Sequence, residues 1–416
     1  MTENEIARQL MACAAKAGPS EQKRAALIDL PRLAWALAAQ IAQGHYRPDP
    51  CSVFAVTDPK LREIFAPAFA DRLVQLWLIG HIGPWLEQRL IDDTYANRKG
   101  GGTHRAIARL QHFMRQPGHR WYCQLDIQAF FPSIERARLL AMWRQTWRPR
   151  LPFAEEDLGQ LDRVAQAILA QDPLDPAPLP SGDRRLLRRI PRHKSLYGAA
   201  PGVGLPIGSL TSQCFANLYL DPLDQFVKHR LKVKGYLRYM DDMILLADDA
   251  ETLVAHRRQI AAFLDERLGL ALHPRKVVLQ RVNQGANFLG AIVYPFHSQV
   301  RQRSVRALRQ RLRAFQALLD PARPAGPPSQ LTAAWQRWLR DHPVWYAPGV
   351  PNPALLQRML ATLNSYYGLF RQANTFRLRH HLYHRELGTL RRFFVPADAA
   401  YRHLRLRRHW LMIRRD

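Results

Sequence analysis

Two adjacent aspartates stand inside an otherwise apolar run. The run extends from Tyr236 to Ala247, and Asp241 and Asp242 lie at its centre. Apolar flanks around a polar centre predict two strands joined by a tight turn at Met240-Asp241-Asp242. Two carboxylates at the tip of a buried hairpin are costly unless a cation compensates their charge. A solvated surface turn also tolerates Asp-Asp, so these residues alone leave both interpretations about equally open.

A third aspartate closes another apolar segment. Asp126 ends the stretch from Trp121 to Ile127, which predicts a buried strand. Alone, this acid predicts only a cap for the following turn. Together with Asp241 on an adjacent strand, it supplies the carboxylates of a two-metal phosphoryl transfer site, in which the ions lie about 3.5 to 4 Å apart. Two Mg2+ ions suit such an all-oxygen site, with Mn2+ as a substitute.

The charge balance predicts a polyanionic partner. Lys and Arg total 61 against 34 for Asp and Glu, which gives a formal net charge of +27. A phosphate backbone is the commonest polyanion that neutralises such an excess. The basic residues are spread over the whole chain and not confined to one amphipathic helix, which favours nucleic acid over an acidic membrane surface.

Cysteine usage and hydropathy favour a soluble, cytoplasmic protein. Cys13, Cys51, Cys123 and Cys214 stand singly, with no CxxC pair or His/Cys cluster, so we expect reduced thiols and no structural zinc. Residues 1–30 lack the basic start and apolar run of a secretory signal. No later segment has the uninterrupted apolar length that crosses a bilayer. We therefore expect no membrane partner.

Hydrophobic periodicity predicts an α+β chain with one insertion and a basic end. Apolar spacing and turn residues define the expected elements. They are two helices in residues 1–45, a strand at Ser52 to Val56 followed by a turn at Thr57-Asp58-Pro59, helices over 67–90 and from His104 to Arg115, and a turn running into a helix over Ile207 to Phe226. The remaining expectations are an insertion from Pro149 to Ala200 with one helix near Leu158 to Ala170, a linker from Asp320 to Ser329, and a basic, aromatic helical region ending in the run Arg402 to Arg415.

Four motifs in order resemble the palm of a prokaryotic reverse transcriptase. They are Asp126, the loop Gly204-Leu205-Pro206-Ile207-Gly208-Ser209-Leu210-Thr211-Ser212-Gln213, Tyr239-Met240-Asp241-Asp242, and Phe288-Leu289-Gly290. The resemblance covers about residues 46–310, and four ordered motifs are far more specific than any one of them. It implies a right-hand polymerase fold and an RNA-directed DNA polymerase.

The resemblance implies a division into segments. It predicts an N-terminal helical extension over 1–45, fingers over 46–120, a palm over 121–290 with the insertion at about 149–200, the start of a helical thumb over 291–320, and a basic helical RNA-binding region over 330–416.

The resemblance also assigns roles around the aspartates. It makes Asp126, Asp241 and Asp242 catalytic, and it places the metal ions on them and on Ile127, which also binds the nucleotide. Lys276 matches a lysine that protonates the leaving pyrophosphate, although Arg275 is the alternative and a simple phosphate contact is another. Phe288-Leu289-Gly290 matches the primer grip.

Further matches concern the incoming nucleotide. Phe131 resembles the aromatic steric gate that excludes a 2′ hydroxyl and so selects deoxynucleotides; a core aromatic is the alternative, which Phe130 fits. Arg62 matches the fingers arginine that grips the triphosphate, and Lys60 is a second match, with a solvated charged turn as the alternative for both. The same resemblance places Tyr239, Gly208, Ser212 and Gln213 at the nucleotide and template, while Ser209 or Thr211 predicts only a helix cap.

One departure narrows the resemblance. Many reverse transcriptases carry Gln-Gly-x-x-x-Ser-Pro in the loop before this helix, whereas this chain has Ile207 in place of the glutamine and Gln213 in place of the proline. This version is similar to that of diversity-generating retroelement enzymes and of neighbouring groups that serve in antiphage defence. The lost amide implies low fidelity.

The resemblance implies a non-coding RNA template, deoxynucleotide substrates and a DNA product, with an accessory protein or a second polymerase as further partners. The alternative is a catalytically silent RNA-binding protein that retains the fold; primase-like synthesis of RNA is a third hypothesis, which Phe131 disfavours.

Overall fold

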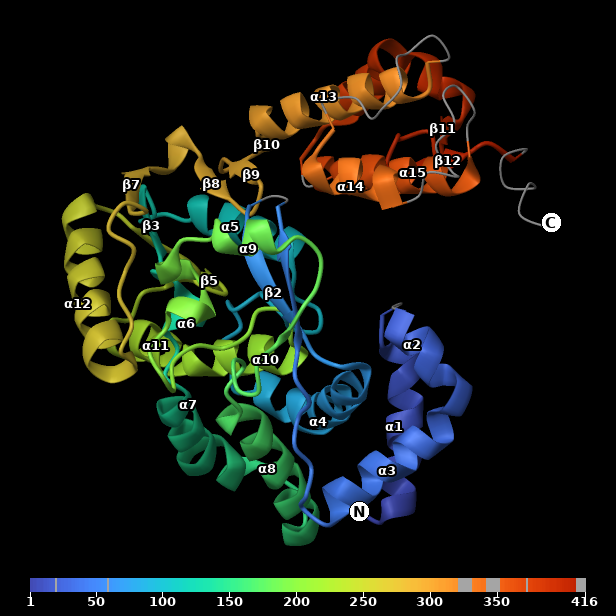
Figure 1. The fold of residues 1–416 in the computed structure, drawn as a ribbon. Coiled ribbons are helices and arrows are strands. Elements are labelled where there is room, and N and C mark those ends of the chain that lie inside the picture. The colour runs from blue at the N-terminus through green and yellow to red at the C-terminus, as the bar shows by residue number, and fades with distance from the viewer. Residues whose placement is uncertain (19–20, 58–59, 321–330, 342–351, 372, 409–416) are drawn as a thin grey trace. The chain divides into compact units, whose positions relative to one another are not determined.

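The structure is a computed structural model that describes residues 1–18, 21–57, 60–320, 331–341, 352–371 and 373–408 (Figure 1). The chain forms two compact units, residues 1–106 with 117–280 and residues 107–116 with 281–416. Helices and largely antiparallel sheets occur together in both, so the predicted α+β class is confirmed. The finer segment boundaries stay a prediction.

A four-stranded sheet lies at the centre of the first unit. Its order is β5-β6-β3-β7, with bounds Gly235–Tyr239 for β5, Asp242–Ala247 for β6, Trp121–Asp126 for β3 and Val278–Arg281 for β7. β6 pairs antiparallel with both β5 and β3. The four residues from Met243 to Leu246 are all buried, because this strand is covered on both faces. The predicted hairpin and the predicted strand before Asp126 are therefore confirmed.

A smaller sheet of order β2-β1-β4 precedes the central sheet in the chain. β1 is Ser52–Val56, as predicted, and it pairs antiparallel with β2, Arg62–Ala66. Its other edge pairs in parallel with β4, Leu179–Pro180, which comes from the insertion. The turn predicted at Thr57-Asp58-Pro59 includes Asp58 and Pro59, which lie outside the described residues.

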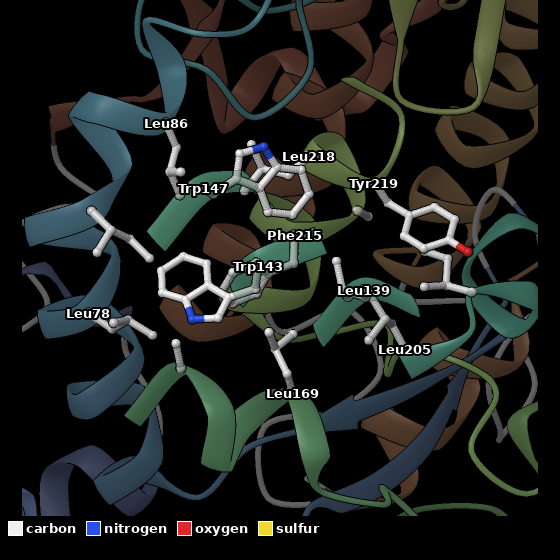
Figure 2. Packing of buried hydrophobic residues seen from close by; sticks show 14 of the residues in the cluster. Leu78, Leu86, Leu139, Trp143, Trp147, Leu169, Leu205, Phe215, Leu218 and Tyr219 are labelled. Atoms are coloured by element: carbon white, nitrogen blue, oxygen red, sulfur yellow. The ribbon is translucent and has the colours of Figure 1, made fainter. Parts of the chain in front are cut away.

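Helices cover the central sheet and build the main core. Figure 2 shows how large apolar side chains from several helices pack together in this core. The residues are Leu78 and Leu86 of one helix, Leu139, Trp143, Trp147, Leu169, Phe215, Leu218 and Tyr219. The Trp143 and Phe215 rings meet edge to face with centroids 5.7 Å apart. The helices of this unit after the N-terminal group are α4 Phe69–Glu87, α5 Thr103–Met114, which continues into the second unit, α6 Phe130–Ser133, α7 Arg136–Met142, α8 Glu155–Ala170, α9 Arg184–Arg188, α10 Leu210–Tyr219, α11 Asp221–Gln225 and α12 Ala250–Leu268.

The N-terminal helices are α1 Glu3–Lys16, α2 Glu21–Ala26 and α3 Leu30–Ala42. A capping box between Thr2 and Glu5 starts α1, and α3 packs against α1 through its buried alanine-rich face. α2, a 3-10 turn at Leu27–Asp29 and α3 follow one another without a break. By length and composition, the part of this helical stretch from Lys23 to Ala42 is the one among the described residues that is long and apolar enough to cross a membrane. Core helices of soluble proteins pass the same test, and the expectation of no membrane partner stays a prediction.

The insertion contains more structure than the single helix predicted for residues 149–200. The predicted helix is present as α8, and it packs into the main core through Leu158, Leu161 and Leu169. The chain then forms β4, α9 and two short 3-10 turns. These elements are too short to produce a periodic hydrophobic pattern, so sequence analysis missed them.

The second unit has its own core and is not wholly helical, contrary to the prediction. A three-stranded antiparallel sheet of order β10-β9-β8 and a β11–β12 hairpin accompany the helices. Trp335 and Tyr367 are buried in the core of this unit, which confirms the core interpretation of these aromatics. The elements are β8 Ala286–Phe288, β9 Ala291–Val293, β10 Ser298–Val300, α13 Gln302–Leu318, α14 Ala333–Asp341, α15 Pro353–Phe370, α16 Phe376–His381, β11 Phe394–Pro396 and β12 Leu404–Leu406.

Three expectations for this end of the chain fall wholly or partly outside the described residues. They are the linker after Asp320, Trp345, and the arginine-rich run beyond Arg408. The turn expected at Phe288-Leu289-Gly290 is present between β8 and β9, with φ of +47° at Leu289 and +95° at Gly290. Its contact with a primer stays a prediction.

A buried carboxylate joins α4 to the chain before β1. Asp71 is 2% exposed and accepts hydrogen bonds from the Tyr46 hydroxyl (2.8 Å) and the Asp49 backbone N–H (3.0 Å). Burial raises the pKa of Asp71 from its ordinary 3.8 to about 6, and the two hydrogen bonds only partly oppose this rise. The ionised form of Asp71 therefore costs free energy in the folded chain.

We expect Asp71→Asn to remove a pH dependence of stability. Because the folded pKa is raised, the stabilisation by Asp71 is complete below pH 3.8 and is lost as the pH rises through about 6. Between about pH 4 and about pH 7, the free energy of unfolding of the natural chain should fall relative to the variant by on the order of 2 kcal/mol. Denaturant titrations at several pH values measure this difference. Tyr46→Phe removes the hydrogen bond that lowers the pKa of Asp71, so it should make stability fall more steeply with pH. If neither variant differed from the natural chain in the pH dependence of its stability, the raised pKa of Asp71 would be contradicted.

Candidate active site

The register of the central sheet brings the three predicted aspartates together. Asp126, at the end of β3, pairs with Asp242, the first residue of β6, and Tyr239 of β5 pairs with Asp242 from the other side. Met240 has φ of +58°, a left-handed conformation that makes the turn between β5 and β6 tight. The backbone N–H of Ile127 donates to the carbonyl of Asp241 (3.3 Å), so the ends of both strands are joined beside the carboxylates.

Burial and mutual repulsion act on these carboxylates. Desolvation raises the pKa of Asp241, and the charge of Asp126 raises it further. Desolvation likewise raises the pKa of Asp242 to about 7, and Gln124 opposes this rise by donating a hydrogen bond of 2.9 Å to Asp242 Oδ1. The three negative charges therefore favour nearby cations, and the chain supplies some of them.

Lys276 is one of these cations. The backbone N–H of His273 donates to the carbonyl of Asp126 (2.7 Å), which ties the segment after α12 to the end of β3. Three residues later, Lys276 Nζ lies 2.6 Å from Asp126 Oδ1, and the pair is partly exposed. This contact favours Lys276 over Arg275 as the basic residue of the site.

Arg62 is a second cation near the carboxylates. It begins β2, its side chain is exposed, and its charge acts to lower the pKa of Asp241. β2 is fixed against the glycine-led loop, because the Phe65 N–H donates to the Ile207 carbonyl (2.7 Å). A Cβ at Gly208 would lie 2.6 Å from the Phe65 carbonyl oxygen, and Gly208 has φ of +124°, so only glycine fits there.

Two predicted aromatics lie on α6, directly after the aspartate strand. Phe130 is 2% exposed and belongs to the core, as the sequence indicated, whereas Phe131 is only partly buried. Their rings meet edge to face with centroids 5.5 Å apart. Phe131 is therefore the ring that remains open to a ligand, and Ala129 before it has φ of +45°, which turns the chain sharply after Asp126.

The start of α10 is built by a cap rather than by the residues predicted to bind substrate. Ser209 is the N-cap and accepts from the Ser212 N–H, while its hydroxyl donates to Gln75. The capping interpretation of Ser209 is therefore confirmed. Ser212 is 5% exposed and Gln213 partly buried, so Gln213 is the more accessible of the two. Lys60 is exposed, and its role stays a prediction.

A buried ion pair that sequence analysis did not assign holds the turn between β5 and β6. Arg238 and Asp224 are both fully buried, and the guanidinium reaches Asp224 with bonds of 2.6 to 3.0 Å. Arg238 Nη1 also donates to the Met240 carbonyl and to Asn217 Oδ1, both at 3.0 Å. The pair therefore fixes the residue that immediately precedes Asp241. Its signal in the sequence is an arginine within an apolar strand, because a buried charge requires a partner.

Within the described residues, no group of three His, Cys, Asp or Glu side chains is placed to hold a metal ion. The donor chemistry nevertheless suits Mg2+, since the residues at the site are carboxylates with adjacent backbone carbonyls. Burial raises the pKa of Asp241 and of Asp242, and the Lys276 charge opposes the rise at both, with Arg62 opposing it at Asp241. An oxygen-preferring divalent cation therefore fits this set of residues.

We expect Asp224→Asn to destabilise the first unit strongly. The substitution leaves the Arg238 charge buried without its counterion, which costs about 3 to 5 kcal/mol. Urea denaturation monitored by tryptophan fluorescence measures the loss. Asp248→Asn is the matched control, because Asp248 follows β6 and pairs with Arg120 while both side chains are more than half exposed, at 52% and 73%. The control should lose less than about 1 kcal/mol; equal losses for both variants would rule out a dominant role for the buried pair.

The sequence also matches known proteins over this region. Residues 57–293 match the family described as reverse transcriptase (RNA-dependent DNA polymerase). Protein YkfC of Escherichia coli (strain K12) is 22% identical over 308 residues, which cover 64% of this chain and 71% of that protein. The group II intron-encoded protein LtrA of Lactococcus lactis subsp. cremoris is 21% identical over 318 residues, 68% of this chain. The chain spans about half the length of LtrA, at 53%.

Solved telomerase structures are similar at lower identity. Apo telomerase from Candida tropicalis matches with 11% identity and a TM-score of 0.43, over 90% of this chain and 63% of that one. Telomerase from Candida albicans in complex with the TWJ fragment of telomeric RNA matches with 11% identity and a TM-score of 0.42, over 84% and 60%. The match over residues 57–293 spans more than half of the chain and contains all three aspartates. The chain belongs to the reverse transcriptase family of RNA-dependent DNA polymerases, and it has the right-hand polymerase fold of that family.

Proposed function

We propose that this chain copies a dedicated non-coding RNA into DNA by two-metal phosphoryl transfer, within a retroelement or an antiphage defence system in the cytoplasm. One observation carries the proposal: Asp126 of β3 and Asp242 of β6 pair on adjacent strands, Asp241 lies in the turn between β5 and β6, and Lys276 is bound to Asp126. The family match supports RNA-directed DNA synthesis, and the net charge of +27 supports a nucleic-acid substrate.

The aspartates and one backbone carbonyl would hold the metal ions. Asp126, Asp241 and the carbonyl of Ile127 provide oxygen donors at the end of two joined strands, and Asp242 is oriented by Gln124. When bound there, two Mg2+ ions would supply charge that activates the attacking 3′ hydroxyl and stabilises the triphosphate and its leaving group. The chain itself contributes a fixed geometry, because the buried Arg238–Asp224 pair holds the turn.

Two basic residues act on the phosphates of the nucleotide. Arg62 presents an exposed guanidinium near Asp241 and is suited to a bidentate grip on the triphosphate. Lys276 is exposed enough, at 47%, to leave Asp126 for the pyrophosphate. In that position its ammonium stabilises the departing charge or donates a proton to it.

Phe131 selects the sugar. Its ring follows the aspartate strand on α6 and is partly exposed beside the buried Phe130. A ring below the ribose position leaves no room for a 2′ hydroxyl, so deoxynucleotides are the substrates. Gly208 lets the Ile207 loop approach β2 closely, and with isoleucine in place of an amide side chain we expect relaxed fidelity.

A template of dedicated non-coding RNA is supported by the relatives. LtrA is encoded by a group II intron. Similarity of the loop from Gly204 to Gln213 to diversity-generating and defence enzymes adds an accessory protein or second polymerase as a partner. If the chain bound RNA but synthesised no DNA, the function would instead be that of a catalytically silent RNA-binding protein that retains the polymerase fold.

We expect primer extension on an RNA template with Mg2+, and its loss in Asp126→Asn and Asp241→Asn. Each aspartate is proposed to bind the metal ions that stabilise the charge of the transition state. We therefore expect loss of one carboxylate to lower the rate of incorporation by about 1,000-fold or more. Incorporation of labelled deoxynucleotides measures the rate. Asp248→Asn is the control. Asp248 is exposed and follows β6, so this variant should retain activity. Absence of synthesis by the natural chain across templates and metals would refute the proposal.

We expect Phe131→Ala to admit ribonucleotides. Removing the ring opens the space for a 2′ hydroxyl, so the preference for deoxynucleotides, measured as a ratio of kcat/KM values, should fall about 10-fold or more. Phe131→Tyr keeps the ring and should keep the preference. A preference that is unchanged in Phe131→Ala would show that another residue selects the sugar.

A further inference from the structure

The insertion carries a dense basic segment. Within residues 184–194, six of eleven residues are Arg or Lys and one more is His. All six Arg and Lys side chains are exposed, and within the described part of the chain none of them forms an ion pair. The six are Arg184, Arg185, Arg188, Arg189, Arg192 and Lys194. Like charges this close repel each other, so the segment favours a polyanion that neutralises them.

The segment is held to the small sheet at both ends. Before it, the Leu179 N–H donates to the Cys51 carbonyl (2.8 Å) and the Ser181 N–H to the Val53 carbonyl (2.7 Å). After it, the buried carboxylate of Glu63 on β2 accepts from the Ser195 hydroxyl (2.7 Å) and from the Leu196 backbone N–H. A charged surface that is fixed in place loses less conformational entropy when it binds than a free loop does.

The helix between these anchors has an apolar and a basic side. Leu187 of α9 packs against a small core that contains Val53, Phe65 and Leu196, and α9 lies against the sheet of β1 and β2 (Figure 1). The four arginines at 184, 185, 188 and 189 remain exposed. Packing of the leucine therefore turns the arginines outward as one surface.

The C-terminal end of the segment adjoins the elements that carry Arg62 and Phe131, the residues proposed to act on the nucleotide. Glu63, which anchors the segment, directly follows Arg62 in β2. At the same end of the segment, Arg192 and His193 share a hollow of about 350 Å3 with Ser133 of α6, the helix that carries Phe131. The C-terminal end of the basic segment thus lies beside both the strand of Arg62 and the helix of Phe131.

We propose that residues 184–194 are a docking surface for the unpaired RNA template strand on its way to the nucleotide site. The proposal rests on the proposed function. A primer end is already paired when it reaches such a site, so the strand that approaches unpaired is the template. Its phosphates match the outward arginines, and contacts to phosphate position a strand without reading its sequence.

Replacement of Arg184, Arg185, Arg188 and Arg189 by Gln tests the surface. Gln keeps the helix propensity of α9 while removing four charges. Anisotropy of a labelled, unstructured RNA measured over a range of salt concentrations gives the slope of log affinity against log salt. For single strands the slope falls by about 0.7 for each phosphate that the protein no longer neutralises, so we expect a decrease of about 2 to 3.

A charge-matched control separates this surface from the general charge of the chain. Gln at Arg230, Lys234, Arg258 and Arg267 removes four exposed charges from α12 and from the segment before β5, and it should leave the slope nearly unchanged. A second variant, Arg192→Gln with Lys194→Gln, lies outside α9 and should lower the slope by about 1. Thermal melts confirm that each variant folds. Equal slopes for the fourfold variant and the control would overturn the proposal.

Extension assays identify the strand. On a primer–template with one unpaired template nucleotide, the fourfold variant should bind the substrate and extend the primer as the natural chain does. When the template carries a long unpaired extension, the variant should bind that substrate about 10-fold or more weakly than the natural chain does. A long unpaired extension on the 5′ end of the primer should bind equally to both proteins. Equal weakening by both extensions would overturn assignment to the template. A natural chain that shows the RNA slope but no synthesis would refute the proposed function and leave the surface standing.

Discussion

The fully buried pair of Arg238 and Asp224 is the interaction on which the active site depends. Two isolated charges at this depth would cost many kilocalories per mole, and here every strong donor of the guanidinium fork has an acceptor nearby. One of these acceptors is the Met240 carbonyl, in the left-handed residue before Asp241. Tyr236 and Thr94 also donate to Asp224, so strands and helices from distant parts of the chain meet at one carboxylate. The network fixes a turn that would otherwise relax as its two aspartates repel.

The carboxylates themselves are held in an unfavourable state that suits a metal site. Burial and neighbouring charge raise the pKa of Asp241 and Asp242, and the compensating cations come from two separate elements, Lys276 after α12 and Arg62 on β2. Neither cation is buried, and Lys276 forms an ion pair with Asp126. Under the proposed function these basic side chains would serve both the carboxylates and the substrate phosphates, and this would couple nucleotide binding to the charge state of the site.

Sequence patterns were sufficient where local chemistry determines structure. The apolar flanks of Asp241 predicted the hairpin, the run before Asp126 predicted its strand, and alternation predicted β1. Patterns failed where structure depends on distant partners. Arg238 lies in a strand whose burial is visible, but its partner Asp224 is fourteen residues away on a helix. The β11–β12 hairpin and β4 have only three and two residues per strand, too few for a period to appear.

The insertion illustrates how such a segment becomes part of the fold. β1 would present an open edge without β4, and exposed edges invite unwanted pairing. Pro180 has no backbone N–H to donate, and β4 does not need one at this position. The backbone N–H groups that donate to the β1 side are those of Leu179 and Ser181, on either side of Pro180. Glu63 would be buried without a donor if Ser195 and Leu196 were absent, at a cost of several kilocalories per mole. The strand that presents Arg62 therefore requires the insertion for its own stability, and the same contacts fix the basic surface of residues 184–194.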